Sequence, residues 1–588
     1  MNRTGVIYGI NGPVVYIKGN TGFKMAEMVY VGKEKLVGEV IGLDKDRTTI
    51  QVFEETTGIK PGEIVEATGD AISVYLAPGI LHNIFDGIER PLSEIAKIGG
   101  AYISRGTVVD SLDKEKLWDA HMIVKEGDRV SGGSIICEVP ETKAIVHKVM
   151  VPPNLSGVLT KVMPDGQYTI CDTIAVLQLD DGTEKELTMM QKWPIRVPRP
   201  TTRRYPASKP LVTGQRILDT LFPIAKGGTA AIPGGFGTGK TMTQHAIAKW
   251  SDADLIVYIG CGERGNEMTE VLEDFSKLID PKSGNPMMDR TVLIANTSNM
   301  PVAAREASIY TGLTLAEYYR DMGYHVAIMA DSTSRWAEAL RELSGRLEEM
   351  PAEEGFPAYL ASRLSAFYER AGMVENLNGT EGSVTIIGAV SPQGGDFSEP
   401  VTQNTKRFVR CFWGLDKNLA YSRHFPAINW LTSYSEYLPD LASWYADNVG
   451  SDFIDDRNQM VAILNQESSL MEIVKLIGSD VLPDDQKLTL EIARVIRLGF
   501  LQQNAFHPQD TSVPLAKQQK MMETILYLYE KSKALVSMGM PMSVLKEDKI
   551  FDRVISIKYD VENDRLDKFD DYKKAIDKFY DDVIARNA

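Results

Sequence analysis

One short run of residues constrains the fold of this 588-residue chain more than any other. It fits the pattern GxxxxGK[ST], follows the apolar stretch TAAIPG and precedes TMTQHAIAKW, a good helix former. A strand, a glycine-rich loop and a helix in this order form the setting that the pattern requires in a nucleotide-binding domain. The run consists of Gly234, Gly235, Phe236, Gly237, Thr238, Gly239, Lys240 and Thr241.

Each part of the loop has a chemical reason. Glycines allow backbone N–H groups to curl around phosphate, and the following helix directs its positive dipole end at the same place. Lys240 can reach the β- and γ-phosphates, and the hydroxyl of Thr241 can bind Mg²⁺. The loop therefore predicts a site for ATP or ADP with Mg²⁺. The alternative is a chance glycine-rich turn before a helix.

Around the loop, from about residue 210 to 435, apolar runs alternate with helical stretches. The runs DLIVYIG, TVLIANTS, HVAIMADS and SVTIIGAVS are separated by segments such as NEMTEVLEDFSKLI and AAREASIYTGLTLAEYYRDMG. Strands separated by helices predict a parallel sheet that is covered on both faces.

An acidic residue ends one of these runs. Val326 to Asp331 is an apolar strand that finishes in a carboxylate, and ligands bind outside the carboxyl ends of parallel strands. We expect Asp331 to hold Mg²⁺, directly or through water. The alternative is that Asp331 caps the following helix.

A second carboxylate follows the strand after the loop helix. Glu263 and Arg264 are expected just past its carboxyl end, where a carboxylate can orient or deprotonate an attacking water and an arginine can stabilise γ-phosphate charge. The alternative is a surface ion pair between the two. Glu267 and Glu270 are interpreted as surface acids that the helix dipole favours.

The rest of the chain divides by composition into parts with different secondary structure. Short β-branched runs broken by turns predict a small barrel in residues 1–70. A connector (71–109) leads to a β-rich insertion (110–185), where VKEGDRVSGGSIICEV resembles hairpins of biotinyl/lipoyl-type sandwiches. We expect deletion of the insertion to spare the nucleotide core. The nucleotide domain occupies 186–435, and a helical domain occupies 436–588.

Composition limits the partners and the compartment. A net charge of −16 disfavours nucleic acid as a partner. The four cysteines have no zinc-ligand spacing and are interpreted as reduced thiols of a cytoplasmic protein. The first residues lack the pattern of a signal peptide, and no stretch of about 18 apolar residues occurs. Any ion transport must then belong to other subunits.

Taken together, four segments make the resemblance specific. GGFGTGKT, GERGNE, MADSTSRWAEALRELSGRLEEMPAEEGFPAYLASRL and AVSPQGGDFSEPVTQ resemble the catalytic A subunit of V-type and A-type rotary ATPases, over essentially the whole chain. The resemblance implies an N-terminal β-barrel, a protruding insertion, a RecA-like nucleotide domain and a helical C-terminal domain. It also implies ATP hydrolysis or synthesis coupled to H⁺ or Na⁺ transport.

The resemblance also implies roles and partners. Glu263 becomes the residue that activates water, Arg264 a phosphate contact, and Phe425 and Phe506 the aromatic residues that pack against adenine. The chain would alternate with a B subunit in an A₃B₃ hexamer, and the B subunit would supply an arginine finger. A central shaft and peripheral stalk subunits would connect it to the membrane sector, so it would be peripheral on the membrane.

Two departures from the family pattern and three rival functions remain. Relatives often carry other residues at Gly235 and Thr238, and the bulk of Thr238 bears on nucleotide affinity. Cys261 is retained as a candidate redox sensor. The rivals are a RecA-like nucleic-acid translocase, an ATPase of a protein-secretion apparatus, and a structural ring protein that binds nucleotide without catalysis. The charge, the insertion, and the intact loop with Glu263 argue against them in that order.

Overall fold

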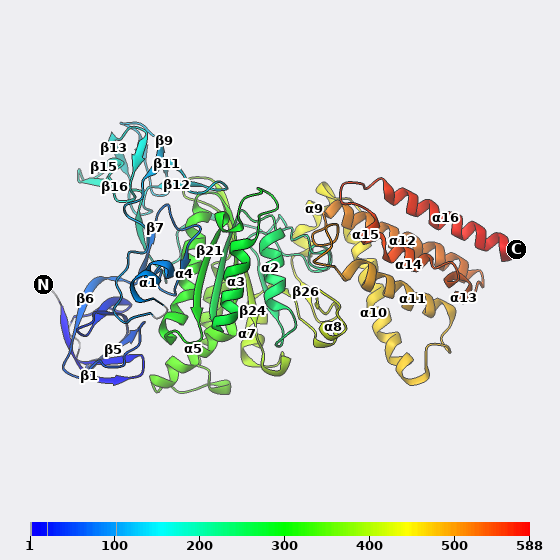
Figure 1. Cartoon of the computed structure of the whole chain (residues 1–588), viewed down its shortest axis with the longest axis horizontal. Coiled ribbons are helices and arrows are strands. Elements are labelled where there is room, and N and C mark those ends of the chain that lie inside the picture. The colour runs from blue at the N-terminus through cyan, green and yellow to red at the C-terminus, as the bar shows by residue number, and fades with distance from the viewer. Residues whose placement is uncertain (1–2, 20–21, 101–102, 588) are drawn as a thin grey trace. The chain divides into compact units, whose positions relative to one another are not determined.

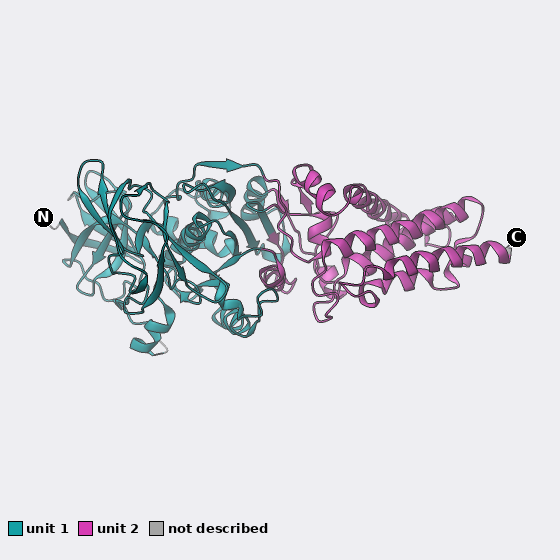
Figure 2. Cartoon of the chain, turned by 90° about the horizontal axis from the view of Figure 1, so that it is seen from above, with its two compact units in different colours: residues 1–206, 226–231, 253–409 teal, residues 207–225, 232–252, 410–588 magenta. Residues whose placement is uncertain are grey.

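The computed structural model describes residues 3–19, 22–100 and 103–587 (Figure 1). The chain forms two compact units, which Figure 2 colours separately. Unit 1 comprises residues 1–206, 226–231 and 253–409, and unit 2 comprises residues 207–225, 232–252 and 410–588.

Unit 1 begins with a closed antiparallel barrel in the order β1-β2-β5-β4-β3-β6. Side chains alternate between its inside and outside, as a strand requires, and the interior is filled by β-branched and leucine side chains such as Val15, Ile17 and Val40. The strands are β1 (Thr4–Asn11), β2 (Val14–Lys18), β3 (Glu27–Val31), β4 (Leu36–Leu43), β5 (Arg47–Val52) and β6 (Ile64–Ala71).

The insertion consists of two four-stranded antiparallel sheets, in the orders β10-β13-β15-β16 and β12-β11-β9-β14. Apolar residues such as Cys137, Val149 and Leu177 are buried. The strands are β9 (Trp118–Met122), β10 (Arg129–Val130), β11 (Ile135–Pro140), β12 (Val146–Met150), β13 (Gly157–Val162), β14 (Gly166–Tyr168), β15 (Ala175–Leu179) and β16 (Glu184–Leu187).

A parallel sheet forms the centre of unit 1. Neighbouring strands run in the order β24-β22-β20-β21-β8, and all four of these pairings are parallel. Its strands are buried almost throughout because helices cover them, which explains their continuous apolar sequences. The strands are β8 (Ile84–Phe85), β20 (Leu255–Glu263), β21 (Thr291–Thr297), β22 (His325–Asp331) and β24 (Glu381–Val390).

Helices and short strands complete unit 1. β23 (Gly372–Glu375) joins β24 and β18 (Arg203–Tyr205), and β7 (Ser73–Leu76) pairs with β17 (Gln191–Pro194). The helices are α1 (Leu92–Gly99), α3 (Gly265–Lys277), α4 (Val302–Asp321), α5 (Thr333–Arg346), α6 (Leu360–Glu369) and α7 (Pro400–Phe408), with 3₁₀ turns at Met287–Arg290, Glu353–Gly355 and Gln393–Gly395.

Buried polar contacts join the insertion to α4. Nδ1 of His147 lies 2.8 Å from a carboxylate oxygen of Glu141, and Nε2 lies 2.9 Å from the hydroxyl oxygen of Tyr318. The hydroxyl of Tyr319 donates to Glu141 at 2.9 Å, and the backbone N–H groups of Gly79 and Leu81 donate to the same carboxylate. Loss of the insertion would remove Glu141 and His147 as partners of these polar groups.

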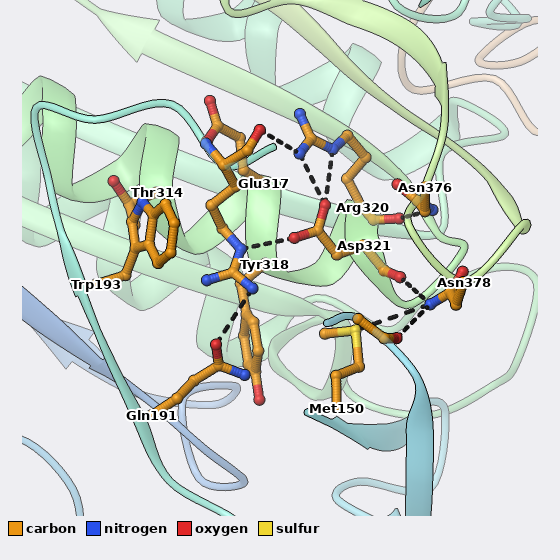
Figure 3. A network of polar contacts seen from close by, with 12 residues as sticks. Met150, Gln191, Trp193, Thr314, Glu317, Tyr318, Arg320, Asp321, Asn376 and Asn378 are labelled. Atoms are coloured by element: carbon orange, nitrogen blue, oxygen red, sulfur yellow. Dashed lines mark hydrogen bonds and ion pairs between the residues drawn. The ribbon is translucent and has the colours of Figure 1, made fainter. Parts of the chain in front are cut away.

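A second network holds the carboxyl end of α4 (Figure 3). Asp321 accepts from Arg199, which lies between β17 and β18, at 2.6 Å and from Arg320 at 2.7 Å. The side-chain amide of Asn378 donates to the Asp321 carbonyl at 2.9 Å and to the Gly133 carbonyl of the insertion at 3.2 Å. The segment between β17 and β18 and the insertion are therefore both bonded to one end of α4.

Unit 2 contains the loop helix and the C-terminal helices. β19 (Thr229–Pro233) begins in unit 1 and ends in unit 2, where α2 (Lys240–Trp250) follows. Apolar residues such as Leu464, Ile492 and Met522 form the core between the long helices α10, α11 and α12. The other elements are η1 (Ile217–Leu221), β25 (Cys411–Phe412), α8 (Lys417–Tyr421), β26 (Tyr434–Ser435), α9 (Leu438–Asn448), α10 (Phe453–Ile477), α11 (Asp484–Val495), η5 (Ile496–Leu501), α12 (Leu515–Ser537), α13 (Met542–Lys546), α14 (Ile550–Ile555), α15 (Ile557–Asp560) and α16 (Lys568–Asn587).

The predicted fold class is confirmed: a β-barrel, a β-rich insertion, an α/β nucleotide domain and a helical C-terminal domain follow one another. The segment boundaries at residues 70, 109, 185 and 435 stay predictions. The compact units divide the chain differently, since the loop segment 232–252 belongs with the C-terminal helices. Among the described residues, no helix is both long and apolar enough to cross a membrane.

Candidate functional site

The predicted phosphate-binding loop of unit 2, residues 234–241, contains positions that favour glycine. Gly237 and Gly239 have φ angles of 76° and 91°, in the left-handed region that favours glycine. A Cβ atom on Gly234 would lie 2.5 Å from Oγ1 of Thr238 and 2.8 Å from Cβ of Leu415. The loop then enters α2, which begins at Lys240. Such a cradle of N–H groups at a helix N-terminus suits a phosphate chain.

The side chains of the loop are organised by its own backbone. The amine of Lys240 donates to the carbonyls of Gly234 at 2.8 Å and Gly235 at 3.3 Å. The hydroxyl of Thr238 is buried and donates to the Gly235 carbonyl at 2.8 Å, so its bulk lies within the loop. Phe236 is 83% exposed. Thr241 occupies the first turn of α2, the position expected for a magnesium ligand.

The two predicted adenine residues also belong to unit 2 and are linked to each other. The Phe425 ring lies close to the loop: its Cε1 is 3.9 Å from the place of a Cβ on Gly239. The backbone N–H of Gln503 donates to the Phe425 carbonyl at 2.8 Å. Phe506, three residues further on, is 95% exposed. An exposed aromatic ring held by backbone hydrogen bonds can accept a flat base.

In unit 1, the two predicted carboxylates stand at the carboxyl ends of neighbouring parallel strands. Asp331 is the last residue of β22 and pairs in register with Gly260 of β20. It is 3% exposed, and the Tyr258 hydroxyl donates to it at 3.2 Å. Burial, together with the Asp331 charge, raises the pKa of Tyr258 well above its usual value. Ser332, and not Asp331, is the residue that precedes α5.

Glu263 is the last residue of β20, whereas the sequence predicted it just past the end of the strand, because the apolar run DLIVYIG stops at Gly260. Burial raises the pKa of Glu263 to about 8, and the charge of Asp331 and a hydrogen bond with Glu267 act in the same direction, while Arg335 opposes them. Gly262 has a φ of 73°, and a Cβ there would lie 2.7 Å from Cβ of Arg335. A carboxyl group poised near neutral pH at a strand end is suited to accept a proton from water.

Arg264 lies beside this carboxylate on the surface. It precedes α3 and is exposed, and its guanidinium is 3.9 Å from the Glu267 carboxylate. Glu267 stands in the first turn of α3, as predicted, but its carboxyl group also meets Glu263. The sequence reasoning missed Glu267 and Arg335 as neighbours of Glu263. The sequence offers no spacing signal for either neighbour, because Glu263 ends a strand and the four-residue spacing of helical neighbours does not apply there.

Cys261 does not have the properties of a redox sensor. Its side chain is fully buried, and its thiol lies 3.5 Å from the Arg305 carbonyl. Burial raises the pKa of this thiol to about 12. A thiol that is neither accessible nor ionised near neutral pH is a poor nucleophile.

Four family models match successive parts of the chain. They are the β-barrel domain of the ATP synthase alpha/beta family (residues 7–69), the alpha/beta subunit barrel-sandwich domain (109–196), the alpha/beta family nucleotide-binding domain (214–435) and the C-terminal domain of V and A type ATP synthase (442–544). Together they cover the barrel, the insertion, the predicted phosphate-binding loop with both carboxylates, and the first helices of the C-terminal domain.

Curated proteins match over almost the whole chain. The V-type ATP synthase alpha chain 2 of Clostridium tetani is 60% identical over 99% of this chain and 98% of its own. The A subunit of the A-type ATP synthase of Methanopyrus kandleri is 57% identical over 99% and 98%. Among solved structures, the assembled ATPase EscN of the enteropathogenic E. coli type III secretion system has a TM-score of 0.63 and 20% identity, and covers 89% of this chain and 99% of that chain. This last likeness concerns the fold alone.

Proposed function

This chain belongs to the family of catalytic A subunits of V-type and A-type ATP synthases. On that basis we propose the role of each site residue in ATP turnover. The chain is the catalytic subunit of an ion-translocating ATP synthase, and it couples synthesis or hydrolysis of ATP to ion transport. The single observation that carries the residue assignment is the loop of residues 234–241 between β19 and α2, in which Gly237 and Gly239 have positive φ angles and Gly234 has no room for a Cβ atom. We call this loop the glycine cradle.

The loop from Gly234 to Thr241 binds the phosphate chain. Its backbone N–H groups, the dipole of α2 and the amine of Lys240 all favour negative charge at this point. The Thr241 hydroxyl and the Asp331 carboxylate are hard oxygen donors of the kind that Mg²⁺ prefers, with Asp331 acting directly or through water. When bound, Mg²⁺ would neutralise charge on the β- and γ-phosphates.

Glu263 orients the water that attacks the γ-phosphate and accepts its proton during hydrolysis. The raised pKa supports this role, because a stronger base at the strand end accepts a proton more readily near neutral pH. Arg264 contacts phosphate, which its exposure next to Glu263 allows. Phe425 and Phe506 contact the adenine base, and stacking on an aromatic face suits any flat base.

The chain works in an alternating A₃B₃ hexamer with a B subunit, which supplies an arginine to the site. Such a trans-acting arginine contributes about 10³–10⁵ in rate. A central shaft and peripheral stalk subunits connect the hexamer to a membrane sector that moves H⁺ or Na⁺, so the chain is a cytoplasmic protein held at the membrane by the complex. Support comes from the relatives, which are named as subunits of ATP synthases.

The experiment is steady-state hydrolysis of MgATP by this chain alone and after addition of the B subunit from the same complex. We expect strong activation on mixing, since the site lacks its arginine until then. A chain that is fully active alone, and unchanged by the B subunit, would refute the shared site. Lys240→Ala should remove binding of MgATP. For the substitution Glu263→Gln, the matched control is Glu270→Gln, since Glu270 is an exposed carboxylate on α3.

A further inference from the structure

Four charged side chains are buried together in unit 2, away from the phosphate-binding loop in sequence. We call Arg216, Asp510, Lys517 and Lys558 the Arg216 cluster; their exposed fractions are 0%, 0%, 0% and 3%. Arg216 precedes η1, Lys517 is in α12, and Lys558 is in α15. Three cations thus surround one carboxylate, an arrangement that is costly to bury unless each charge has good partners.

Two of these cations, Arg216 and Lys558, donate to backbone carbonyls of residues 498–502. Arg216 forms an ion pair with Asp510 and donates to the carbonyls of Phe500 and, at 2.7 Å, Gln502. Lys558 also donates to Gln502, at 3.1 Å, and to Leu498 at 2.6 Å.

Lys517 holds the other end of residues 502–509. Its amine donates to the carbonyls of Gln509 at 3.2 Å and Val561 at 2.6 Å and to the side chain of Asn563 at 3.0 Å. Burial, together with the repulsion of Arg216, lowers the pKa values of Lys517 and Lys558 to about 8. The cluster thus fixes backbone atoms on both sides of residues 502–509.

This stretch carries Phe506. Asp510, held by Arg216, accepts from the backbone N–H of Asn504 at 2.6 Å, and the Asn504 side chain accepts from the N–H of Phe506 at 2.9 Å. A chain of three contacts therefore leads from the buried guanidinium to the backbone of an aromatic residue that is itself 95% exposed. The ring has almost no packing of its own, so its position depends on this backbone.

The same stretch also holds Phe425. Gln503 donates its backbone N–H to the Phe425 carbonyl at 2.8 Å. Its side chain is held at both ends of the amide group. The amide oxygen accepts from the backbone N–H of Arg216 at 2.9 Å, and the amide nitrogen donates to the Gly214 carbonyl at 2.9 Å. Displacement of Gln503 would consequently move the backbone at both aromatic positions.

We propose that the Arg216 cluster is a positioning device for the base-binding side of the nucleotide site: it holds residues 502–509 so that Phe425 and Phe506 present their rings to adenine. Its residues do not touch the nucleotide; they act through the two aromatic residues. The proposal rests on the adenine role assigned above to Phe425 and Phe506. It is distinct from phosphate binding, which belongs to the loop at 234–241.

The test compares two ligands that differ in the base. Affinities of the full-length chain for MgATP and for magnesium tripolyphosphate, which has phosphates but no adenine, are measured by calorimetry. The variants are Lys558→Met, which removes the anchor of Gln502, and Gln503→Leu, which removes the clamp without removing a charge. Lys558→Arg is the conservative rescue, and Lys533→Met is the matched control, an exposed lysine on α12. Thermal melts establish that each variant folds.

We expect MgATP binding to weaken about five- to thirtyfold in Lys558→Met and Gln503→Leu, within the range that base–aromatic stacking contributes. Tripolyphosphate binding should change less than about twofold, and Lys558→Arg should recover most of the loss. If the folded variants bind MgATP as the wild type does, or lose both ligands equally, the positioning role is wrong. Should Lys558→Met fail to fold, Gln503→Leu decides alone.

A further variant separates this proposal from the one beneath it. Phe506→Ala should weaken MgATP and spare tripolyphosphate. If Phe506→Ala binds MgATP normally while Lys240→Ala loses both ligands, then the adenine role of Phe506 fails and phosphate binding stands. If Phe506→Ala shows the expected selective loss and Gln503→Leu does not, only the positioning role fails.

Discussion

Replacement of Gly234 by alanine tests the glycine cradle through two atoms whose positions are known. The new Cβ would lie 2.5 Å from Oγ1 of Thr238 and 2.8 Å from Cβ of Leu415, where ordinary contacts begin at 3.4 Å. Neither neighbour moves freely: the Thr238 hydroxyl is bonded to the Gly235 carbonyl, and the backbone N–H of Leu415 donates to the Pro233 carbonyl at 2.8 Å. The overlap must therefore be relieved by the loop itself.

The magnitude follows from these contacts. Overpacking of this kind costs about 1–3 kcal/mol. Rotation of Thr238 out of the way loses its hydrogen bond, which adds about 0.5–1.5 kcal/mol. We expect Gly234→Ala to cost about 2–4 kcal/mol in total. This cost appears as a lower free energy of unfolding, as weaker MgATP binding, or as a combination of the two. About 2 kcal/mol placed on binding is a loss of roughly thirtyfold.

The assay combines calorimetric titration with MgATP and denaturant unfolding of the isolated chain. The double variant Gly234→Ala/Thr238→Ala should recover part of the loss, because it removes the nearer contact and leaves Leu415. Gly345→Ala in α5 is the matched control: a Cβ there meets nothing within 4 Å, so it should be neutral or add about 0.5–1 kcal/mol of stability. If Gly234→Ala changes neither stability nor affinity by more than about 0.5 kcal/mol, the cradle argument is wrong.

Other changes probe the carboxylate, the buried lysines and the thiols. Glu263→Gln in the complex assembled with its B subunit should keep MgATP affinity and lower kcat by about 10²–10⁴; normal turnover would mean that another group handles the water. The pKa of Lys558 is about 8 in the folded chain against 10.5 for an ordinary lysine, so the unfolded chain binds more protons between these values. The free-energy penalty of burying the charge is complete below pH 8 and is relieved above it. The free energy of unfolding of the wild type relative to Lys558→Met should therefore rise with pH, by at most about 1.4 kcal/mol per pH unit. A difference that stays flat from pH 8 to 10 contradicts this. Cys171 is the exposed cysteine, whereas burial raises the pKa of the other three thiols, Cys137, Cys261 and Cys411, to about 12. A colorimetric thiol reagent at pH 8 should therefore find one fast thiol of four, and a second fast thiol would show that a buried cysteine is accessible.

Local patterns in the sequence were sufficient for several parts of the site. The strand, loop and helix around Lys240 are contiguous, so one motif specifies them together. Asp331 could be placed at a strand end because a buried parallel strand appears in the sequence as an unbroken apolar run whose last residue is visible. Glu263 was placed only approximately, since the apolar run stops at Gly260 and β20 continues to Glu263. The barrel and the helical C-terminal domain followed from turn spacing and from helical periodicity in the same way.

Contacts between distant segments required the tertiary structure. Arg216 meets Asp510 across 294 residues, and His147 meets Tyr318 across 171. No periodicity or spacing predicts such pairs, because burial of a charge depends on which elements pack around it. For the same reason the sequence predicted that the insertion could be deleted without effect on the nucleotide core. The structure buries Glu141 and His147 against α4, so deletion of residues 110–185 would leave the hydroxyls of Tyr318 and Tyr319 without these partners and should destabilise unit 1.

The environment of Glu263 illustrates the same division. Its residue type and its strand end were visible in the sequence, whereas its pKa was not, because that depends on Asp331, Glu267 and Arg335 from three other elements. The sequence by itself determined which chemical groups this protein possesses and in which order its domains follow. Only the tertiary structure decided which groups are buried together, since electrostatic and packing energies depend on distances in space and not along the chain.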